Sequence, residues 1–495
     1  MSVAKIKRFI ERFNADPAFR KAYRENPGTG LDEIGLSDFD PEILRPIWDK
    51  EVRDKNEEHK KKHGDYLISS AELNEYREFY AAKLRLNERV QSASSPKHGN
   101  FQKWRDRQIA RLSSQVIDEN AQILVHSPFA IELTQGCSVG CYFCSLDAPK
   151  LTNTFEYNEE NRQLWNEVLT ALKNIMGDAS QWGFCYWATD PLDNPDYEKF
   201  ASDFAEKLGR FPQTTTAKPL VNVERTRALI KLSEKYTPKL INRFSILTSR
   251  GLRDVHKHFT PEELRQVELV TLNPDGDAVK TKSGRFYALC KEKPEVWKKE
   301  VSKLKETALV PRHCFSEDEW EAFFRSLDER TCSCVSGFVI NMFERKIKLI
   351  SPCKPSDKYP KGFITFVEAP FHDGASLEAA IEDIMSKNVS NSVSHHNDLQ
   401  FRQDLRFVET EHGFALNSPT KTLTVENPKL SPFLRYLGKR INEGGLSAQL
   451  LALTAQYQFG IPPNVTKAQL ESLFSHGLLN EQRVPDLIQE KNSCQ

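Results

Sequence analysis

Three cysteines within eight residues constrain this chain more than any other feature of its sequence. The three are Cys137, Cys141 and Cys144, spaced C-x3-C-x2-C after a β-rich segment. Gly136 and Gly140 relax the backbone between them, so one short loop can bring all three thiols together. Three thiolates can hold a cubane iron–sulfur cluster and leave its fourth iron open to a small molecule. Either Tyr142 or Phe143 can cover such a cluster and limit water.

The triplet is also compatible with a structural zinc site, or with three buried cysteines that meet by chance. Zinc prefers four ligands, usually in paired C-x2-C units, and no partner pair lies nearby. The chain holds 10 cysteines and no apparent export signal, so a disulfide framework is not expected. The spacing therefore favours the cluster.

Strands that alternate with helices surround the triplet. A β-rich segment, 123–134, leads directly into it, and a helical pattern follows at 159–175. Further strands are predicted at Phe184–Thr189, Thr214–Leu220, Phe244–Thr248 and Val267–Leu272. This alternation predicts an α/β fold with a parallel sheet or barrel, in which motifs at the carboxyl ends of strands carry the chemistry.

The two ends of the chain differ from its middle in the secondary structure that their sequence patterns predict. Ile6, Phe9, Ile10 and Phe13 recur at helical spacing, and Asp16-Pro17 can start a second helix. The last ~95 residues read as three short strands followed by three helices, close to a winged helix. We therefore predict a helical region at 1–118, a central α/β domain at 119–395 and a C-terminal domain at 396–495.

The composition argues against several classes of protein. Lys plus Arg and Asp plus Glu both number 69, so the net charge of zero gives no general case for nucleic-acid binding. No apolar run is long enough for a membrane span. The N-terminus is amphipathic and lacks the apolar stretch of a secretory signal, so a cytoplasmic location is expected.

The triplet, at this spacing after a first strand, resembles the signature of radical S-adenosylmethionine (SAM) enzymes. The resemblance implies a partial (β/α)6 barrel with a 4Fe-4S cluster on Cys137, Cys141 and Cys144. SAM would bind the open iron, and an electron donor such as flavodoxin or ferredoxin would reduce the cluster. One-electron cleavage of SAM would then give a 5′-deoxyadenosyl radical, so the cofactor supplies the difficult chemistry.

Members of that superfamily hold the SAM amino group with a Gly-Gly-Glu-Pro-like turn after the second strand. The matching segment here, 186–192, lacks the glycines but keeps an acid before proline. The resemblance implies that Asp190 accepts hydrogen bonds from the SAM ammonium, assisted by the carbonyls of Ala188 and Thr189. The alternative that this segment is an ordinary turn at the end of a strand remains open. Superfamily contacts to ribose and carboxylate fall at the fourth strand end, where the candidates are Ser245, Thr248 and Arg250.

Several segments also resemble the radical SAM peptide epimerases that act on ribosomally made peptides of the proteusin type. They are Gly136–Cys144, Trp187–Tyr197, Cys334–Met342 and Ile350–Cys353. The implied reaction removes a Cα hydrogen from an L-residue and returns one from the opposite face, which gives the D-residue. Thioether formation or backbone excision in a peptide remains open, as does a non-catalytic peptide-binding metal protein.

Epimerisation requires a hydrogen donor, and a thiol suits that role because its S–H bond is weak. If Val335–Met342 and Lys346–Ile350 are antiparallel neighbours, Cys334 and Cys353 lie at the same end of the pair. Cys353 is the first candidate donor if its strand runs with the others, and Cys334 is the second. The alternative that both are buried structural thiols remains open. A further alternative is a second cluster on Cys314, Cys332, Cys334 and Cys353.

The C-terminal segment, about 405–479, resembles the PqqD-like winged-helix modules that bind leader peptides. Such a module would add the leader of a precursor peptide as an extra strand, while the barrel modifies residues far along the same peptide. An ordinary C-terminal cap on the barrel remains open. The N-terminal helices bear a faint likeness to Nif11-type leader segments, although a scaffold role is the simpler interpretation.

Overall fold

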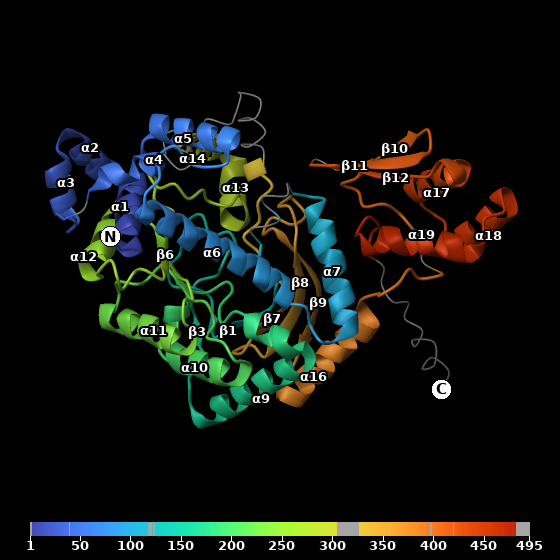
Figure 1. The fold of residues 1–495 in the computed structure, drawn as a ribbon. Coiled ribbons are helices and arrows are strands. Elements are labelled where there is room, and N and C mark those ends of the chain that lie inside the picture. Colours follow the sequence, from blue (N-terminus) through green and yellow to red (C-terminus); the bar gives the residue numbers. More distant parts are fainter. Residues whose placement is uncertain are drawn as a thin grey trace.

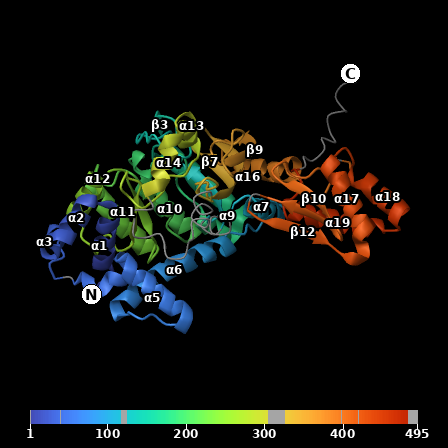
Figure 2. The same ribbon diagram turned by 90° about the horizontal axis from the view of Figure 1, so that it is seen from above.

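The computed structural model describes residues 2–38, 40–116, 121, 124–303, 326–396, 398–418 and 420–481. This part of the chain mixes helices with open sheets, as the alternation predicts, and none of its sheets closes into a barrel (Figure 1). The partial (β/α)6 barrel remains a prediction. The N-terminal helices and the C-terminal domain lie at opposite ends of the molecule in both views (Figures 1 and 2).

The N-terminal region is helical where it is described, and it has a core of its own. Phe9 and Phe13 are buried there against residues of α6. The Asp16 side chain caps α2 and Pro17 occupies its first turn, which confirms the predicted helix start. The elements are α1 (Val3–Ala15), α2 (Pro17–Glu25), α3 (Pro27–Glu33), η1 (Pro41–Leu44), α4 (Arg45–Trp48), α5 (Lys50–His63), α6 (Ala71–Ala93) and α7 (Gly99–Ser113).

The central strands follow the predicted order. Strand β5 pairs in parallel with β4 and β6, and the predicted strand at Phe184–Thr189 is reduced to one parallel bridge between Phe184 and Ala130. The strands here are β1 (Ser127–Glu132), β2 (Thr134–Gln135), β3 (Asn153–Thr154), β4 (Thr215–Thr216), β5 (Asn242–Ile246) and β6 (Val267–Thr271). The helical elements are α9 (Glu159–Met176), η2 (Gly177–Trp182), η3 (Pro191–Asp193), α10 (Tyr197–Leu208), α11 (Val223–Tyr236) and α12 (Ser249–His258).

A second group of strands extends the sheet beyond β1 in the order β1-β7-β8-β9. Strand β7 runs parallel to β1, and β8 runs antiparallel to β7, so the condition that places Cys334 and Cys353 at one end of the pair is met. Ser127 lies opposite Val335, and Glu132 lies opposite Asn341. The elements are α13 (Gly284–Glu292), α14 (Pro294–Ser302), β7 (Val335–Asn341), β8 (Lys346–Pro352), β9 (Phe363–Pro370), α16 (Gly374–Asp383) and the π-helical turn η6 (Ile384–Asn388).

The extended sheet has two different faces because successive side chains of a strand point to opposite sides. Along β8, Ile347 and Leu349 belong to the main core, which also contains Trp104 of α7 and Trp165 of α9. Lys346, Lys348 and Ile350 point the other way and line a cavity described below. The covered face thus stabilises the fold, and the opposite face is available to a ligand.

The C-terminal domain has a separate core and consists of the predicted three strands and three helices. Strands β10 (Arg406–Thr410), β11 (Gly413–Asn417) and β12 (Thr422–Glu426) form an antiparallel meander. It continues through η7 (Pro428–Leu430) into α17 (Ser431–Glu443), α18 (Ala448–Phe459) and α19 (Pro463–Ser475). The content agrees with a winged helix, and that assignment remains a prediction.

Helix α7 joins this domain to the central sheet. On one side, Arg111 donates hydrogen bonds to the Ser351 hydroxyl at 2.9 Å and the Pro352 carbonyl at 2.8 Å. On the other, Arg107 pairs with Glu481 at 3.0 Å. The backbone after α19 passes so close that a Cβ at Gly477 would lie 2.8 Å from the Arg111 side chain. The C-terminal domain is therefore seated directly on α7.

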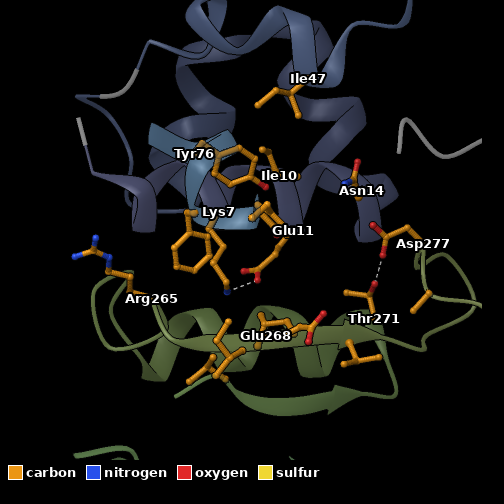
Figure 3. Close-up of a pocket in the computed structure, with 17 residues that line it drawn as sticks. Lys7, Ile10, Glu11, Asn14, Ile47, Tyr76, Arg265, Glu268, Thr271 and Asp277 are labelled. Carbon is orange, nitrogen blue, oxygen red and sulfur yellow. Dashed lines mark hydrogen bonds and ion pairs between the residues drawn. The ribbon is translucent and has the colours of Figure 1, made fainter. Parts of the chain in front are cut away.

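A cavity of about 390 Å³ separates α1 and α6 from strand β6 (Figure 3). Its acidic side chains already have partners, since Glu11 pairs with Lys7 and Asp277 accepts a hydrogen bond from Thr271. None of its lining residues is a cysteine. We therefore regard this cavity as the junction where the N-terminal helices cover an edge strand.

Candidate active site

The cysteines lie on a closed loop, residues 136–152, which we call the cysteine loop. It starts and ends at one place because β2 and β3 pair antiparallel. The Cys137 N–H donates to the Pro149 carbonyl at 2.9 Å. Gly136 has φ +89°, and a Cβ there would lie 2.2 Å from the Lys150 carbonyl oxygen. Only glycine fits this position, which explains the residue before the first cysteine.

The three thiols of the loop are partly exposed and form no disulfide. Burial raises the pKa of Cys137, and burial together with the charge of Cys144 raises that of Cys141 to about 11. The Ala148 N–H donates to the Cys144 sulfur at 3.3 Å, a contact that stabilises a thiolate and tunes a bound cluster.

The donor type of the three cysteines is that of an iron–sulfur cluster, and the cluster remains a prediction. Within the described residues, no three His, Cys, Asp or Glu side chains converge closely enough to hold one metal ion. The thiolates of a cubane bind different irons, so they need to surround a volume rather than meet at a point. The three thiols are free and partly exposed on one loop, so they are available as ligands.

The start of helix α13 holds the tip of the cysteine loop. The Arg285 guanidinium donates to the Cys141 carbonyl at 2.9 Å, and the Arg285 backbone N–H donates to the Cys144 carbonyl at 2.9 Å. Gly284 has φ +59°, and a Cβ there would lie 2.4 Å from the Ser145 carbonyl oxygen. The loop and the helix are therefore in backbone contact, a feature that the sequence alone does not reveal.

A second contact that holds the cysteine loop, at Asp193, is also not evident from the sequence. Its carboxylate accepts hydrogen bonds from the Ser138 N–H at 2.8 Å and the Ser138 hydroxyl at 2.5 Å. The Lys218 ammonium pairs with the same carboxylate at 2.6 Å. The Asp193 side chain is fully buried. The only sequence signal is a second aspartate three positions after Asp190.

Asp190, the predicted SAM contact, is buried and already accepts three hydrogen bonds. The donors are the Thr216 hydroxyl at 2.8 Å, the Ala217 N–H at 2.8 Å and the Leu192 N–H at 3.0 Å. Burial raises the pKa of Asp190. These contacts fix the turn that precedes η3, so the carboxylate has a structural role. A contact of Asp190 or the half-buried Thr189 with SAM remains a prediction.

The candidates near the end of β5 have different surroundings. Ser245 is half-buried on the face of β5 opposite the helix-covered core. Thr248 caps α12, because its hydroxyl accepts the Gly251 N–H at 2.9 Å. The Arg250 side chain is 86% exposed and lies 3.6 Å from Asp254 on the same helix. In the described part of the chain, none of its contacts joins it to the cysteine loop.

The direction of strand β8 does not support Cys353 as the first donor. Since β8 runs antiparallel to β7 and β1, Cys353 is level with the start of β1, whereas the cysteine loop follows its end. Cys353 lies beside the Arg111 charge instead. Cys334 lies at the same end of the strand pair, as predicted. Cys314 and Cys494 fall outside the described residues, so the second-cluster alternative stays open.

Among the described residues, two non-cluster thiols lie near the cysteine loop, Cys290, which packs in one apolar cluster with Phe143, and Cys332. The Cys332 sulfur lies 3.9 Å from the Ser283 hydroxyl, which in turn donates at 3.1 Å to the carbonyl of Ser145, the residue after Cys144. Burial raises the pKa of Cys332 to about 12, with the charges of Cys334 and Cys144 adding to the effect. The sequence alone suggests Cys332 only as a ligand of a second cluster.

A cavity of about 560 Å³ opens between the cysteine loop and the exposed face of β7, β8 and β9. We call it the loop cavity. Its wall from the cysteine loop includes Gly136, Asp147 and Pro149, and its sheet wall includes Asn341 and Lys348. Four lysines border it, which are Lys346, Lys348, Lys358 and Lys361. A ligand in this cavity would contact the cysteine loop, although none of the three cysteines lines it.

Comparisons with known proteins add little to this geometry. No family model matches the chain. The uncharacterized protein y4wI of Sinorhizobium fredii (strain NBRC 101917 / NGR234) is 29% identical over 487 residues, covering 97% of this chain and 88% of that protein. A solved structure, "Crystal structure of BtrN in complex with AdoMet and 2-DOIA", matches with 16% identity and a TM-score of 0.23. It covers 29% of this chain and 56% of that chain, under two thirds of its length, and the score is too low to establish a shared fold.

No helix in the described part of the chain is both long and apolar enough to cross a membrane.

Proposed function

We propose that this chain is a radical SAM enzyme that converts L-residues of a ribosomally made peptide into D-residues. The observation that carries the proposal is the cysteine loop, with three unpaired thiols on a clamped loop beside an open cavity. The α/β context and the resemblance of the triplet and its neighbouring segments to peptide epimerases support the same function. Of these segments, Gly136–Cys144 belongs to the loop and Trp187–Tyr197 contacts it through Asp193.

Bound at this loop, the cluster and SAM would supply a radical that removes a hydrogen atom from a Cα position. Cys137, Cys141 and Cys144 would hold the cluster. Phe143 is 9% exposed and packs with α13 residues, so it shields the loop from water, whereas Tyr142 is 55% exposed. Arg285 and Asp193 keep the loop in place through its backbone and through Ser138.

The donor must deliver a hydrogen atom to the opposite face of the planar Cα centre. In that step a thiol S–H bond breaks and a Cα–H bond forms, which leaves a sulfur-centred radical. One electron from a flavodoxin- or ferredoxin-type donor and one proton from solvent then restore the thiol. We assign this role first to Cys332, which approaches the cysteine loop through Ser283. Cys334 comes second because it lies two residues from Cys332, although it shares the strand end of Cys353.

A Cys332→Ala variant is expected to bind iron and cleave SAM but to form no D-residues. The measurement uses a candidate precursor peptide in D2O, in which the exchangeable thiol places deuterium at Cα of each inverted residue. Peptide hydrolysis and chiral chromatography count the D-residues, and mass spectrometry counts the deuterium. Cys353→Ala is the matched control, and it should epimerise like the wild type because Cys353 lies beside Arg111.

Normal epimerisation by Cys332→Ala would rule out this donor and move the test to Cys334. Thioether bridges or excised backbone in the wild-type product would instead favour another radical modification of the peptide. A reconstituted protein that binds zinc, stays colourless and never cleaves SAM would eliminate both radical reactions. It would leave a non-catalytic peptide-binding protein.

The C-terminal domain is our candidate for leader-peptide binding. Strand β12 lies at the edge of the meander, and in the described residues its outer edge pairs with no further strand. Thr422, Thr424 and Glu426 alternate as exposed residues along it, and Leu423 and Val425 pack toward the domain core. A leader peptide could add a strand there through main-chain hydrogen bonds.

Removing the leader from the precursor is expected to raise KM by about 100-fold or more, because tethering supplies an effective concentration that the core peptide alone lacks. The change in kcat should be much smaller. Steady-state kinetics with leader–core and core peptides test this, with a scrambled leader as control. Equal KM values for the three peptides would show that the domain is an ordinary cap.

A further inference from the structure

The loop cavity has an excess of unpaired positive charge. Glu132 is half-buried and accepts hydrogen bonds from the Ala188 N–H at 2.9 Å and the Asn341 amide at 3.1 Å. Glu344 accepts a hydrogen bond from the Gln135 amide at 2.9 Å. Neutral donors leave the charges of these carboxylates in place, so Glu132, Glu344 and Asp147 offset three of the four lysines and one positive charge remains in excess.

The lysines divide into a paired and an unpaired set. Lys348 pairs with Glu368 at 3.2 Å, and Lys361 lies 3.9 Å from Asp147. Asp147 is shared, because Arg285 also donates to it at 3.1 Å. Lys346 and Lys358 form no ion pair with any other residue that the structure describes. Both border the cavity and are exposed, so their ammonium groups can reach a ligand.

The inner wall of the cavity is apolar. The rings of Trp187 and Phe363 lie 6.0 Å apart, and Val339 and Ile350 line the same wall. Val339 and Ile350 are both nearly fully buried. An apolar wall bordered by unpaired ammonium groups is complementary to a side chain with an aliphatic stem and a terminal carboxylate.

We propose that the loop cavity recognises an aspartate or glutamate side chain of the substrate peptide and so selects acidic segments for reaction. Lys346 and Lys358 provide the charge, and the Trp187 and Phe363 wall contacts the stem. The inference rests on the proposed function, since it takes the ligand of this cavity to be a peptide. The carboxylate would anchor the peptide beside the cysteine loop and set which neighbouring residue is presented to it.

Charge reversal tests the proposal directly. Three fluorescein-labelled pentapeptides, Gly-Ala-Glu-Ala-Gly and its Gln and Lys counterparts, are titrated with the full-length protein and followed by fluorescence polarisation. Wild type should bind the Glu peptide about fivefold more tightly than the Gln peptide, a modest ion-pair contribution that salt weakens. The Lys346→Glu/Lys358→Glu double variant should prefer the Lys peptide instead.

A second double variant, Lys62→Glu/Lys387→Glu, has the same net charge and serves as the matched control. Those two side chains are 65% and 70% exposed and lie outside the cavity, so the Glu preference should persist. Circular dichroism melts establish that both variants are folded. The proposal is overturned if the Lys346→Glu/Lys358→Glu variant still prefers the Glu peptide. It is also overturned if the control variant loses that preference to the same extent.

Two further outcomes separate this inference from the proposed function. Wild type that cleaves SAM but binds all three peptides alike would overturn the acid site alone. Wild type that selects the Glu peptide but never cleaves SAM would overturn the radical function and leave the acid site in place. Loss of SAM binding in the cavity variant, with unchanged peptide preference, would reassign the lysines to the SAM carboxylate and overturn the inference.

Discussion

Replacing any one of Cys137, Cys141 and Cys144 with Ala is expected to abolish SAM cleavage. Each thiolate binds a different iron of the cubane, so two remaining ligands cannot retain an intact cluster. After anaerobic reconstitution, iron content should fall from about four per chain to well below half of that value. Iron and sulfide assays, the visible absorbance and chromatography of 5′-deoxyadenosine measure the two effects.

Cys185→Ala provides the control for that experiment. Cys185 is 1% exposed in the main core, so its loss should cost about 1 kcal/mol of stability and leave the iron content unchanged. An alanine variant of the triplet with full iron content and full SAM cleavage would remove the basis of the proposed function. Loss of iron in Cys185→Ala as well would mean that general instability explains the result.

Gly284→Ala is expected to lower iron content severalfold and to destabilise the protein by about 3 kcal/mol or more. The substitution is strained at φ +59°, and the new Cβ would overlap the Ser145 and Cys144 carbonyl oxygens at 2.4 and 2.6 Å. Both oxygens belong to backbone of the cysteine loop, so relief requires movement of the loop itself. Urea unfolding and iron assays measure stability and cluster retention.

The Gly209→Ala variant separates the effect of backbone strain from that of steric overlap at the new Cβ. Gly209 has φ +95°, similarly left-handed, but nothing lies within 4 Å of a Cβ built there. That variant should cost only about 1 kcal/mol, the strain of the left-handed conformation, and should retain its iron. If the two variants behaved alike, backbone strain alone would explain the loss, and the contact between α13 and the loop would be unimportant.

Local features of the sequence predict much of this fold. Helical spacing from Ile6 to Phe13 and the Asp16-Pro17 start depend on contacts within a few residues, and both are present in the structure. The C-terminal strands and helices also follow from short-range periodicity. The strand predicted at Phe184–Thr189 is mostly missing because ladder formation depends on a neighbouring strand, and β4 has only two residues.

The surroundings of the triplet depend on contacts between distant segments, which spacing cannot reveal. Cys332 approaches the cysteine loop through Ser283 and Ser145, and the loop lies well over 100 positions before both Ser283 and Cys332 in the chain. The direction of β8, which removes the argument for Cys353, follows from sheet order rather than from its own residues. The SAM-contact candidates remain predictions for the same reason.

Helix α7 sets the position of the C-terminal domain relative to the central sheet. Arg111 ties it to the end of β8, and Gly477 and Glu481 seat the C-terminal domain on its other side. A peptide held at β12 while it reaches the cysteine loop must therefore span a set gap rather than follow a swinging module. Under the proposed function, the number of residues between the leader and the modified position would then decide which residues can react, and residues closer to the leader than this gap would not reach the cysteine loop.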